Sequence, residues 1–194
     1  ENNIPEWFIE SCKKISYLFP RAHAVAYVMM AFRIAWFKVY HPLAFYAAYF
    51  SIRAKAFDLR IMTGDLKTQM TEFNRIKALD RSASPRDKDL MSALEVSMEM
   101  YQRGYRFINV DIQHSEARRF SIKDGALLPP FLAIDSLGET VADAIVEERN
   151  ERPFTSLKDL QRRCKVSNTI IDLMKDLKCC GELPEDEQMS LFGA

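Results

Sequence analysis

Hydrophobic and polar positions change their spacing several times along the chain, and each change predicts a different element. Residues 22–37 are almost wholly apolar, with His23 and Arg33 as the interruptions. A helix that is apolar on all sides is typical of a buried element, and this run falls short of the ~20 residues that cross a membrane. We therefore expect a central helix buried inside protein, and no membrane partner.

The segments on either side of this run have shorter patterns. Pro5 begins a first helix, and the apolar residues of 43–52 predict a third helix that packs back on the central one. Apolar residues three and four positions apart predict two amphipathic helices at 66–79 and 87–101. Residues 81–85 are expected to form the turn between them.

After Gly104 the spacing changes to two, which is the period of a strand. Residues 105–110 and 119–122 are predicted to form short strands that end at Asp124-Gly125. A last helical block follows over 131–180. The predicted fold class is therefore mainly α with a short β-strand pair.

The composition is that of a soluble globular protein, with 48% hydrophobic and 28% charged residues among 194. The formal net charge of zero removes any argument from overall basicity, but the charge is unevenly distributed. Residues 1–60 carry +4 and residues 127–194 carry −5. This asymmetry suits a chain that meets phosphates at one end and a protein at the other, and random scatter of surface charges is the alternative.

The cysteines indicate reduced thiols. Four cysteines occur without a Cys-x-x-Cys pair, and the three histidines lie far from them. This pattern fits neither a zinc site nor a disulfide framework, so we expect a cytoplasmic protein. The chain opens with Glu1 and not with Met, and we expect it to be a fragment cut from a longer protein.

Residues 133–145 predict a short helix, a tight turn and a second helix. Gly138 is expected to take a positive φ and to leave backbone amides uncovered. The next helix begins at Glu139-Thr140, so its first N–H groups are free to face an anion. Such a turn grips a DNA phosphate through the main chain without reading bases. The segment resembles the helix–hairpin–helix family, although Ser136 stands where that family usually has a further glycine.

A second unit over 159–177 repeats this plan with a turn that has no glycine. For both units a purely structural hairpin without DNA contact is the alternative. Arg118-Arg119 is either a further phosphate contact or a solvated pair. The candidate DNA-binding residues are Arg118, Arg119, Ser136, Leu137, Gly138, Glu139 and Thr140.

The last residues form a short amphipathic peptide, Gln188-Met189-Ser190-Leu191-Phe192, on an acidic tail. Leu191 and Phe192 are apolar anchors with nothing local to bury them, which is typical of a linear ligand that docks into a groove. The peptide resembles the Gln-x-x-Leu-Phe motif with which bacterial DNA-processing proteins hold the replication sliding clamp. A frayed terminus is the alternative.

Residues 17–27 and 37–48 resemble the fingers motif of the bacterial family C replicative polymerases. The whole chain then resembles the C-terminal part of the PolC type of DNA polymerase III alpha subunit. The resemblance implies four parts in order, namely fingers helices, a short strand connection, a tandem helix–hairpin–helix domain and an acidic tail with the clamp-binding peptide. The corresponding boundaries are 1–103, 104–126, 127–181 and 182–194.

The resemblance implies a DNA-directed DNA polymerase, a nucleotidyltransferase of DNA replication. Its catalytic aspartates and their Mg²⁺ would lie in a palm domain upstream, a proofreading exonuclease would accompany them, and the fragment alone would be inactive. No catalytic or metal-binding residue is expected here. Arg21 and His23 would hold the phosphates of the incoming nucleotide, and Tyr27 would border its base.

The implied partners are duplex primer–template DNA, a deoxynucleoside triphosphate and the sliding clamp of the replisome. A non-enzymatic helix–hairpin–helix adaptor that recruits the clamp is the first alternative. The second alternative is an all-α interaction module unrelated to DNA.

Overall fold

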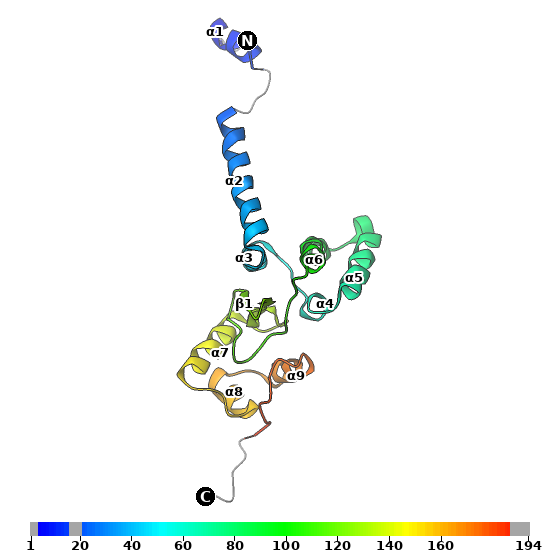
Figure 1. Cartoon of the computed structure of the whole chain (residues 1–194), viewed down its shortest axis with the longest axis vertical. Coiled ribbons are helices and arrows are strands. Elements are labelled where there is room, and N and C mark those ends of the chain that lie inside the picture. Colours follow the sequence, from blue (N-terminus) through cyan, green and yellow to red (C-terminus); the bar gives the residue numbers. More distant parts are fainter. Residues whose placement is uncertain (1–3, 16–20, 187–194) are drawn as a thin grey trace, which may run out of the picture. The chain divides into compact units, whose positions relative to one another are not determined.

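The computed structural model describes residues 4–15 and 21–186 (Figure 1). It divides the chain into two compact units, one up to His41 and one from Pro42 onward. The described residues are mainly helical and carry one two-stranded antiparallel sheet, which confirms the predicted fold class. The four-part division proposed from the sequence stays a prediction.

The first unit contains α1 (Glu6–Lys13) and α2 (Arg21–Tyr40), and neither helix has a buried residue. Apolar side chains on α2 are open to solvent, with Phe32 73% and Trp36 49% exposed. The prediction of a central buried helix is therefore wrong for this chain, because the unit contains only the short α1 beside it. By length and composition alone, the 20 residues of α2 also suffice to cross a membrane.

The second unit begins with a helical layer whose elements follow one another closely. The predicted helix at 66–79 is confirmed, and the helix predicted at 87–101 is one turn longer because Ser84 and Asp87 form a capping box at its start. The segment predicted as one helix over 43–52 is α-helical only at first and then widens into a π-helical turn. The elements of this layer are α3 (Pro42–Ala48), η1 (Tyr49–Arg53), α4 (Leu59–Met62), α5 (Leu66–Leu79), η2 (Asp80–Ser82) and α6 (Pro85–Gln102).

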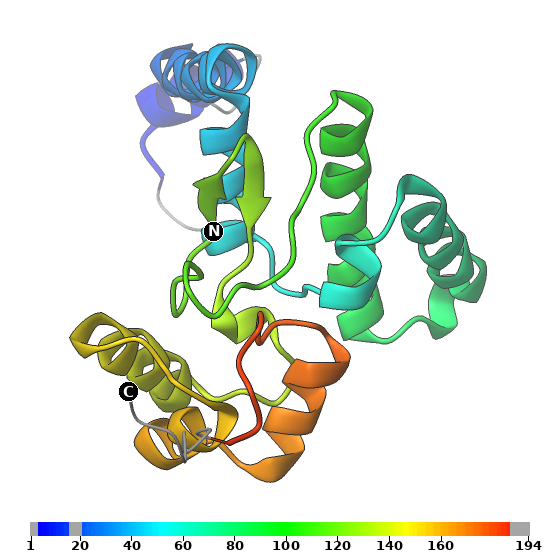
Figure 2. The ribbon, with the colours of Figure 1, turned by 60° about the horizontal axis from the view of Figure 1, so that its bottom comes forward.

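A first core holds this layer together. Figure 2 shows α5 and α6 as a neighbouring helix pair, with the β-hairpin beside α3. Tyr46 of α3 is fully buried, and its hydroxyl donates to Glu99 Oε2 of α6 at 2.7 Å. Burial, followed by the hydrogen bond to Glu99, raises the pKa of Tyr46 to about 12. The fully buried apolar residues of this core are Tyr46, Met62, Ile76, Ala93, Leu94, Met100 and Leu127.

The sheet differs from the expected strand pair. Strands β1 (Ser121–Lys123) and β2 (Ala126–Leu128) pair antiparallel, with Ile122 opposite Leu127. Asp124 and Gly125 have φ of 50° and 74°, so they form the tight turn between two strands and not the end of the pair. The predicted strand over 105–110 is wrong, since these residues contribute only a single bridge.

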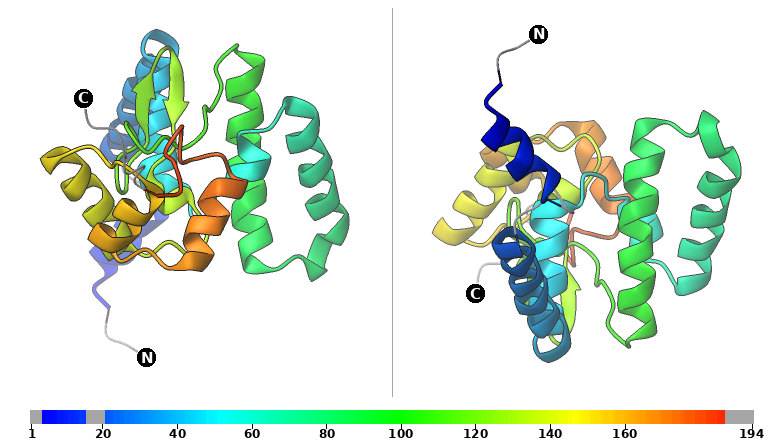
Figure 3. Two further views of the ribbon diagram at one scale, coloured as in Figure 1. Left: turned by 90° about the horizontal axis from the view of Figure 1, so that it is seen from below. Right: turned by 90° about the horizontal axis from the view of Figure 1, so that it is seen from above.

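The rest of the second unit forms the hairpin core. Its elements are η3 (Phe131–Ala133), α7 (Glu139–Glu151), α8 (Leu157–Cys164) and α9 (Asn168–Asp176), which gather at one end of the unit (Figure 3). Val110 and Ile112 also pack here, because the preceding loop folds onto the helices. The most deeply buried members are Ile112, Phe131, Ile134, Ala142, Ile145, Leu160, Met174 and Cys179.

One buried carboxylate ties α8 to the loop before it. Asp159 is 2% exposed, and its oxygens accept hydrogen bonds from Arg162 at 2.9 Å, Arg163 at 3.2 Å and Arg152 at 3.3 Å. Burial acts to raise the pKa of Asp159, but the hydrogen bonds from Arg162, the Thr155 amide and Arg163 outweigh it. The pKa of this carboxyl therefore lies below its usual range, and the group stays charged in the folded protein.

Candidate nucleic-acid interface

The first hairpin runs from η3 through a tight turn into α7. Ser136 has φ of 64° and occupies the left-handed region, whereas Gly138 has φ of −76°. The expectation of a positive φ at Gly138 is therefore wrong, since the sharp reversal of the chain falls two residues earlier. Leu137 is 5% exposed and anchors the turn in the hairpin core.

The start of α7 offers unused donors. Gly138 is the N-cap and supplies no side chain, while its carbonyl accepts from the amides of Val141 at 3.1 Å and Ala142 at 3.0 Å. Within the described part of the chain, the amides of Gly138, Glu139 and Thr140 have no acceptor. These exposed N–H groups, together with the helix dipole, favour an anion.

Gly138 is not required by the fold. A Cβ built on it meets nothing within 4 Å, and its φ is accessible to any residue. The absence of a side chain therefore serves neither backbone strain nor packing in the described structure. What it leaves open is a close approach to the backbone from outside.

The second hairpin has the same plan but a closed start. Ser167 is the N-cap of α9, and its Oγ accepts from the Ile170 amide at 3.4 Å. Lys165 has φ of 54° and reverses the chain after α8, where no glycine is present. Ile171 and Met174 are buried as predicted. Because a side chain already caps this helix, the second hairpin offers fewer free donors than the first.

Carboxylates around the first hairpin are matched by two arginines. Arg118 donates from Nε to Asp143 at 3.0 Å and also pairs with Glu139, and Arg86 pairs with Asp135 at 3.2 Å. The hydrogen bond from Arg118 lowers the pKa of Asp143, so that carboxylate stays charged. Arg118 is thus engaged within the chain in a way that the sequence did not predict.

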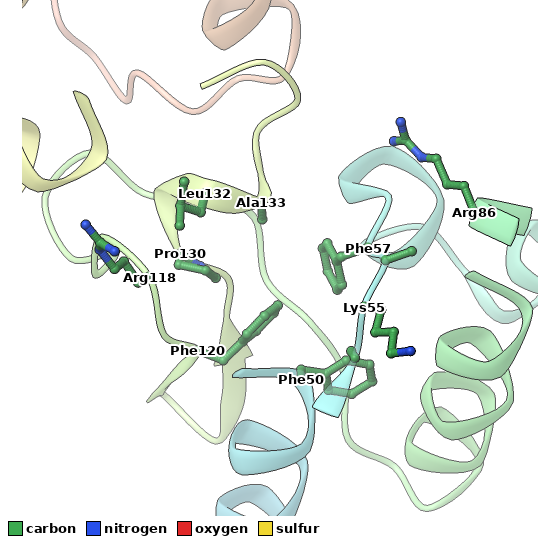
Figure 4. Close-up of a pocket in the computed structure, with 11 residues that line it drawn as sticks. Phe50, Lys55, Phe57, Arg86, Arg118, Phe120, Pro130, Leu132 and Ala133 are labelled. Carbon is green, nitrogen blue, oxygen red and sulfur yellow. The ribbon is translucent and has the colours of Figure 1, made fainter. Parts of the chain in front are cut away.

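A pocket of about 470 Å³ lies beside the first hairpin (Figure 4). Its lining combines three phenylalanines, Phe50, Phe57 and Phe120, with three cations, Lys55, Arg86 and Arg118. We call this the aromatic pocket. Apart from Arg118, none of these residues was predicted, because they come from separate segments and no local spacing connects them.

The predicted nucleotide-binding residues lie on α2 in the first unit. Arg21 is the first residue of the helix, and the rings of His23 and Tyr27 are 4.4 Å apart between centroids. The spacing of four places these two side chains on one helix face. All three residues are exposed.

Two further predictions concern residues or groups that this geometry does not address. The clamp-binding peptide over 188–192 lies outside the described residues, as does the start of the fingers motif at 17–20. Over 4–15 and 21–186, no group of three His, Cys, Asp or Glu side chains is placed to hold a metal ion. These segments therefore do not fit the Mg²⁺ site of a polymerase. Arg119 is exposed and close in sequence to the pocket.

Comparison with known proteins identifies the hairpins and the chain. A family model described as helix-hairpin-helix motif matches residues 104–188. DNA polymerase III PolC-type of Caldanaerobacter subterraneus subsp. tengcongensis is 47% identical over 192 residues, which is 99% of this chain and 14% of that protein. The protein of the same name from Streptococcus pyogenes is 48% identical over 195 residues, or 99% of this chain and 13% of that protein.

The chain therefore spans only 13–14% of the length of these relatives. The match nevertheless runs through both units, including α2 and the hairpins. By its sequence, the chain corresponds to one segment of a PolC-type DNA polymerase III with a helix–hairpin–helix motif.

Proposed function

We propose that this chain is the part of a cytoplasmic replicative DNA polymerase that holds duplex DNA, contacts the incoming nucleotide and tethers the enzyme to a sliding clamp. The observation that carries the proposal is the uncapped start of α7, where three exposed amides have no acceptor among the described residues. Helix N-termini of this kind are suited to phosphate, and backbone contacts of this kind carry no base sequence.

In this proposal the first hairpin binds the DNA backbone and the second supports it. The amides of Gly138, Glu139 and Thr140 donate to one phosphate, and the glycine at the N-cap permits the close approach. Ser136 makes the turn that presents them. In the second hairpin the Ser167 hydroxyl occupies the corresponding position, so that unit contributes mainly packing.

The nucleotide contact is assigned to α2. Arg21 supplies a permanent charge at the positive end of a 20-residue helix, where the dipole also favours phosphate. His23 lies within one turn, and Tyr27 stacks against its ring on the same face. Arg21 and His23 would hold phosphates of a deoxynucleoside triphosphate, and Tyr27 would border its base.

The chemical step is assigned to another part of the polymerase. Mg²⁺-bound aspartates would activate the primer 3′-hydroxyl in an upstream domain, because the described residues provide no metal cluster. We accordingly expect this chain alone to bind DNA without extending a primer. A proofreading exonuclease would also belong to the longer protein.

The exposed apolar surface of α2 is assigned to contact with the rest of the polymerase. A membrane would cover the same surface, but Arg33 near the middle of the helix disfavours insertion. The relatives are DNA polymerases, which supports a protein cover. A non-enzymatic adaptor that recruits the clamp would explain the hairpins but not the match along α2.

The test replaces Gly138 by threonine. The fold should tolerate the change, because a Cβ there meets nothing within 4 Å and threonine is an accepted N-cap residue. Its hydroxyl would occupy a free amide of α7, and its methyl group would block the approach of a phosphate. Affinity for a blunt duplex should fall about tenfold or more, since hydrogen bonds to charged groups contribute roughly 1.5–3 kcal/mol.

The matched control is Ser167→Thr, which keeps the cap of α9 and adds one methyl group. It should leave DNA affinity unchanged. The loss caused by Gly138→Thr should be equal for two duplexes of unrelated sequence, measured by fluorescence anisotropy. If the folded Gly138→Thr variant binds both duplexes as tightly as the unchanged chain, the first hairpin is only structural and the proposal is wrong.

A further inference from the structure

The aromatic pocket has a preformed floor. Phe120 packs against Phe57 with ring centroids 5.1 Å apart and against Phe50 at 5.7 Å. Phe50 is 4% exposed, whereas Phe57 and Phe120 are half-buried and line the pocket (Figure 4). The Phe120 amide donates to Ser51 Oγ of the π-helical turn at 2.9 Å, which fixes the segment carrying this ring.

The rim of the pocket is positively charged and reaches the first hairpin. Arg86 and Arg118 both line it, and their carboxylate partners Asp135 and Glu139 belong to the hairpin turn and the start of α7. Lys55 is exposed and has no carboxylate partner within 4–15 and 21–186. The pocket therefore adjoins the proposed phosphate site and has one cation whose charge is not compensated.

A half-exposed aromatic floor beneath a cation is suited to a nucleotide. Every base has a π-face that stacks on an aromatic ring, and a lysine neutralises the adjoining phosphate. A volume of about 470 Å³ lies within the range of small-molecule sites. A paired base is already stacked within its duplex and does not need such a surface, whereas an unpaired base does.

We propose that the aromatic pocket binds an unpaired nucleotide of the DNA whose duplex is held by the first hairpin. The base stacks on Phe57 and Phe120, and Lys55 contacts its phosphate. This inference rests on the proposed function of the hairpin, since the hairpin brings the DNA to the pocket. It adds a single-stranded site to a surface otherwise assigned to duplex backbone.

The experiment compares four DNA ligands with the whole chain. They are a blunt duplex, the same duplex with a four-nucleotide 5′ overhang, the duplex with a 3′ overhang, and each overhang with abasic units. The unchanged chain should prefer one overhang to the blunt duplex by about fivefold or more, which is the lower end of what stacking one base on an aromatic ring contributes. Abasic units should abolish that preference.

Two variants locate the preference. Ala54→Phe fills the pocket from its lining, and Lys55→Ala removes the uncompensated cation. Both should bind the blunt duplex as the unchanged chain does, and both should lose the preference for the overhang. Lys67→Ala is the matched control, because Lys67 is an exposed lysine on α5 that does not line the pocket.

The outcomes separate this inference from the proposed function. If neither overhang is preferred, or if the preference survives both pocket variants, the pocket does not bind an unpaired nucleotide, although blunt-duplex binding sensitive to Gly138→Thr would still support the hairpin. A preference that persists with abasic units would show charge contact without base stacking, and it too overturns the inference. Should Ala54→Phe fail to fold, Lys55→Ala decides the question alone.

Discussion

Arg118 is expected to act on DNA binding through the carboxylates it neutralises. Its side chain is 49% exposed and pairs with Glu139 and Asp143 on the first two turns of α7. A phosphate bound at the start of this helix would lie near both carboxylates. Removing Arg118 would leave these two charges to repel it, and the sequence alone suggested instead that Arg118 contacts DNA directly.

The size of the effect follows from Coulomb's law. Two unit charges ~6–8 Å apart interact by ~0.5–0.7 kcal/mol in a water-like dielectric, which is the appropriate limit for groups this exposed. The two carboxylates together would therefore cost ~1.2 kcal/mol, or roughly an eightfold loss of affinity. Arg118→Ala should show this loss for a blunt duplex at low salt, where screening is weak.

A rescue experiment separates the two roles of Arg118. Adding Glu139→Gln and Asp143→Asn to Arg118→Ala should restore affinity to within about twofold, because no uncompensated carboxylate remains. Arg81→Ala, an exposed arginine in η2, is the control for the change in net charge. The slope of log affinity against log salt should hardly change, whereas losing a direct phosphate contact lowers it by about 0.9. A lower slope without rescue would refute charge compensation.

Three other predictions follow from single features. Replacing Leu191 and Phe192 by alanine should abolish binding to a sliding clamp in surface plasmon resonance while the thermal unfolding midpoint stays constant; unchanged clamp affinity would contradict the tail assignment. Asp159→Asn should lower the free energy of unfolding by about 2 kcal/mol at pH 7. Because the pKa of Asp159 is lowered in the folded state, this difference should shrink as pH falls below ~4, and a constant difference in urea titrations would argue against it. Ser136→Gly should raise the free energy of unfolding by about 0.5–1 kcal/mol, since a left-handed φ is strained for serine; a lower urea midpoint would count against the strain.

Local patterns predicted the helices well and the strands poorly. The helix Leu66–Leu79 was predicted to the residue because its amphipathic spacing and its Asp65 cap are local signals. The alternation over 105–110 did not produce a strand, because a strand also needs a partner and the available one, β2, already pairs with β1. The Asp124-Gly125 turn was visible in the sequence, but its role as the centre of the hairpin was missed.

The candidate site divides in the same way. The hairpin turn at 136–140 is contiguous, so the sequence predicted its position, although it assigned the positive φ to Gly138 when Ser136 adopts it. The aromatic pocket gathers Lys55, Arg86 and Phe120 from three segments. Only tertiary packing brings those residues together, so no local spacing could have predicted them.

The two hairpins indicate how one repeated motif can serve both binding and stability. In the second, the helix start is capped by Ser167, and the buried Asp159 binds three arginines around α8. Those groups are used within the fold and leave little for a ligand. In the first, the N-cap is a glycine that the fold does not need, and nearby carboxylates are neutralised by Arg118. The donors that the first hairpin leaves free are thus the ones a phosphate requires, and the second provides the rigid base from which they are presented.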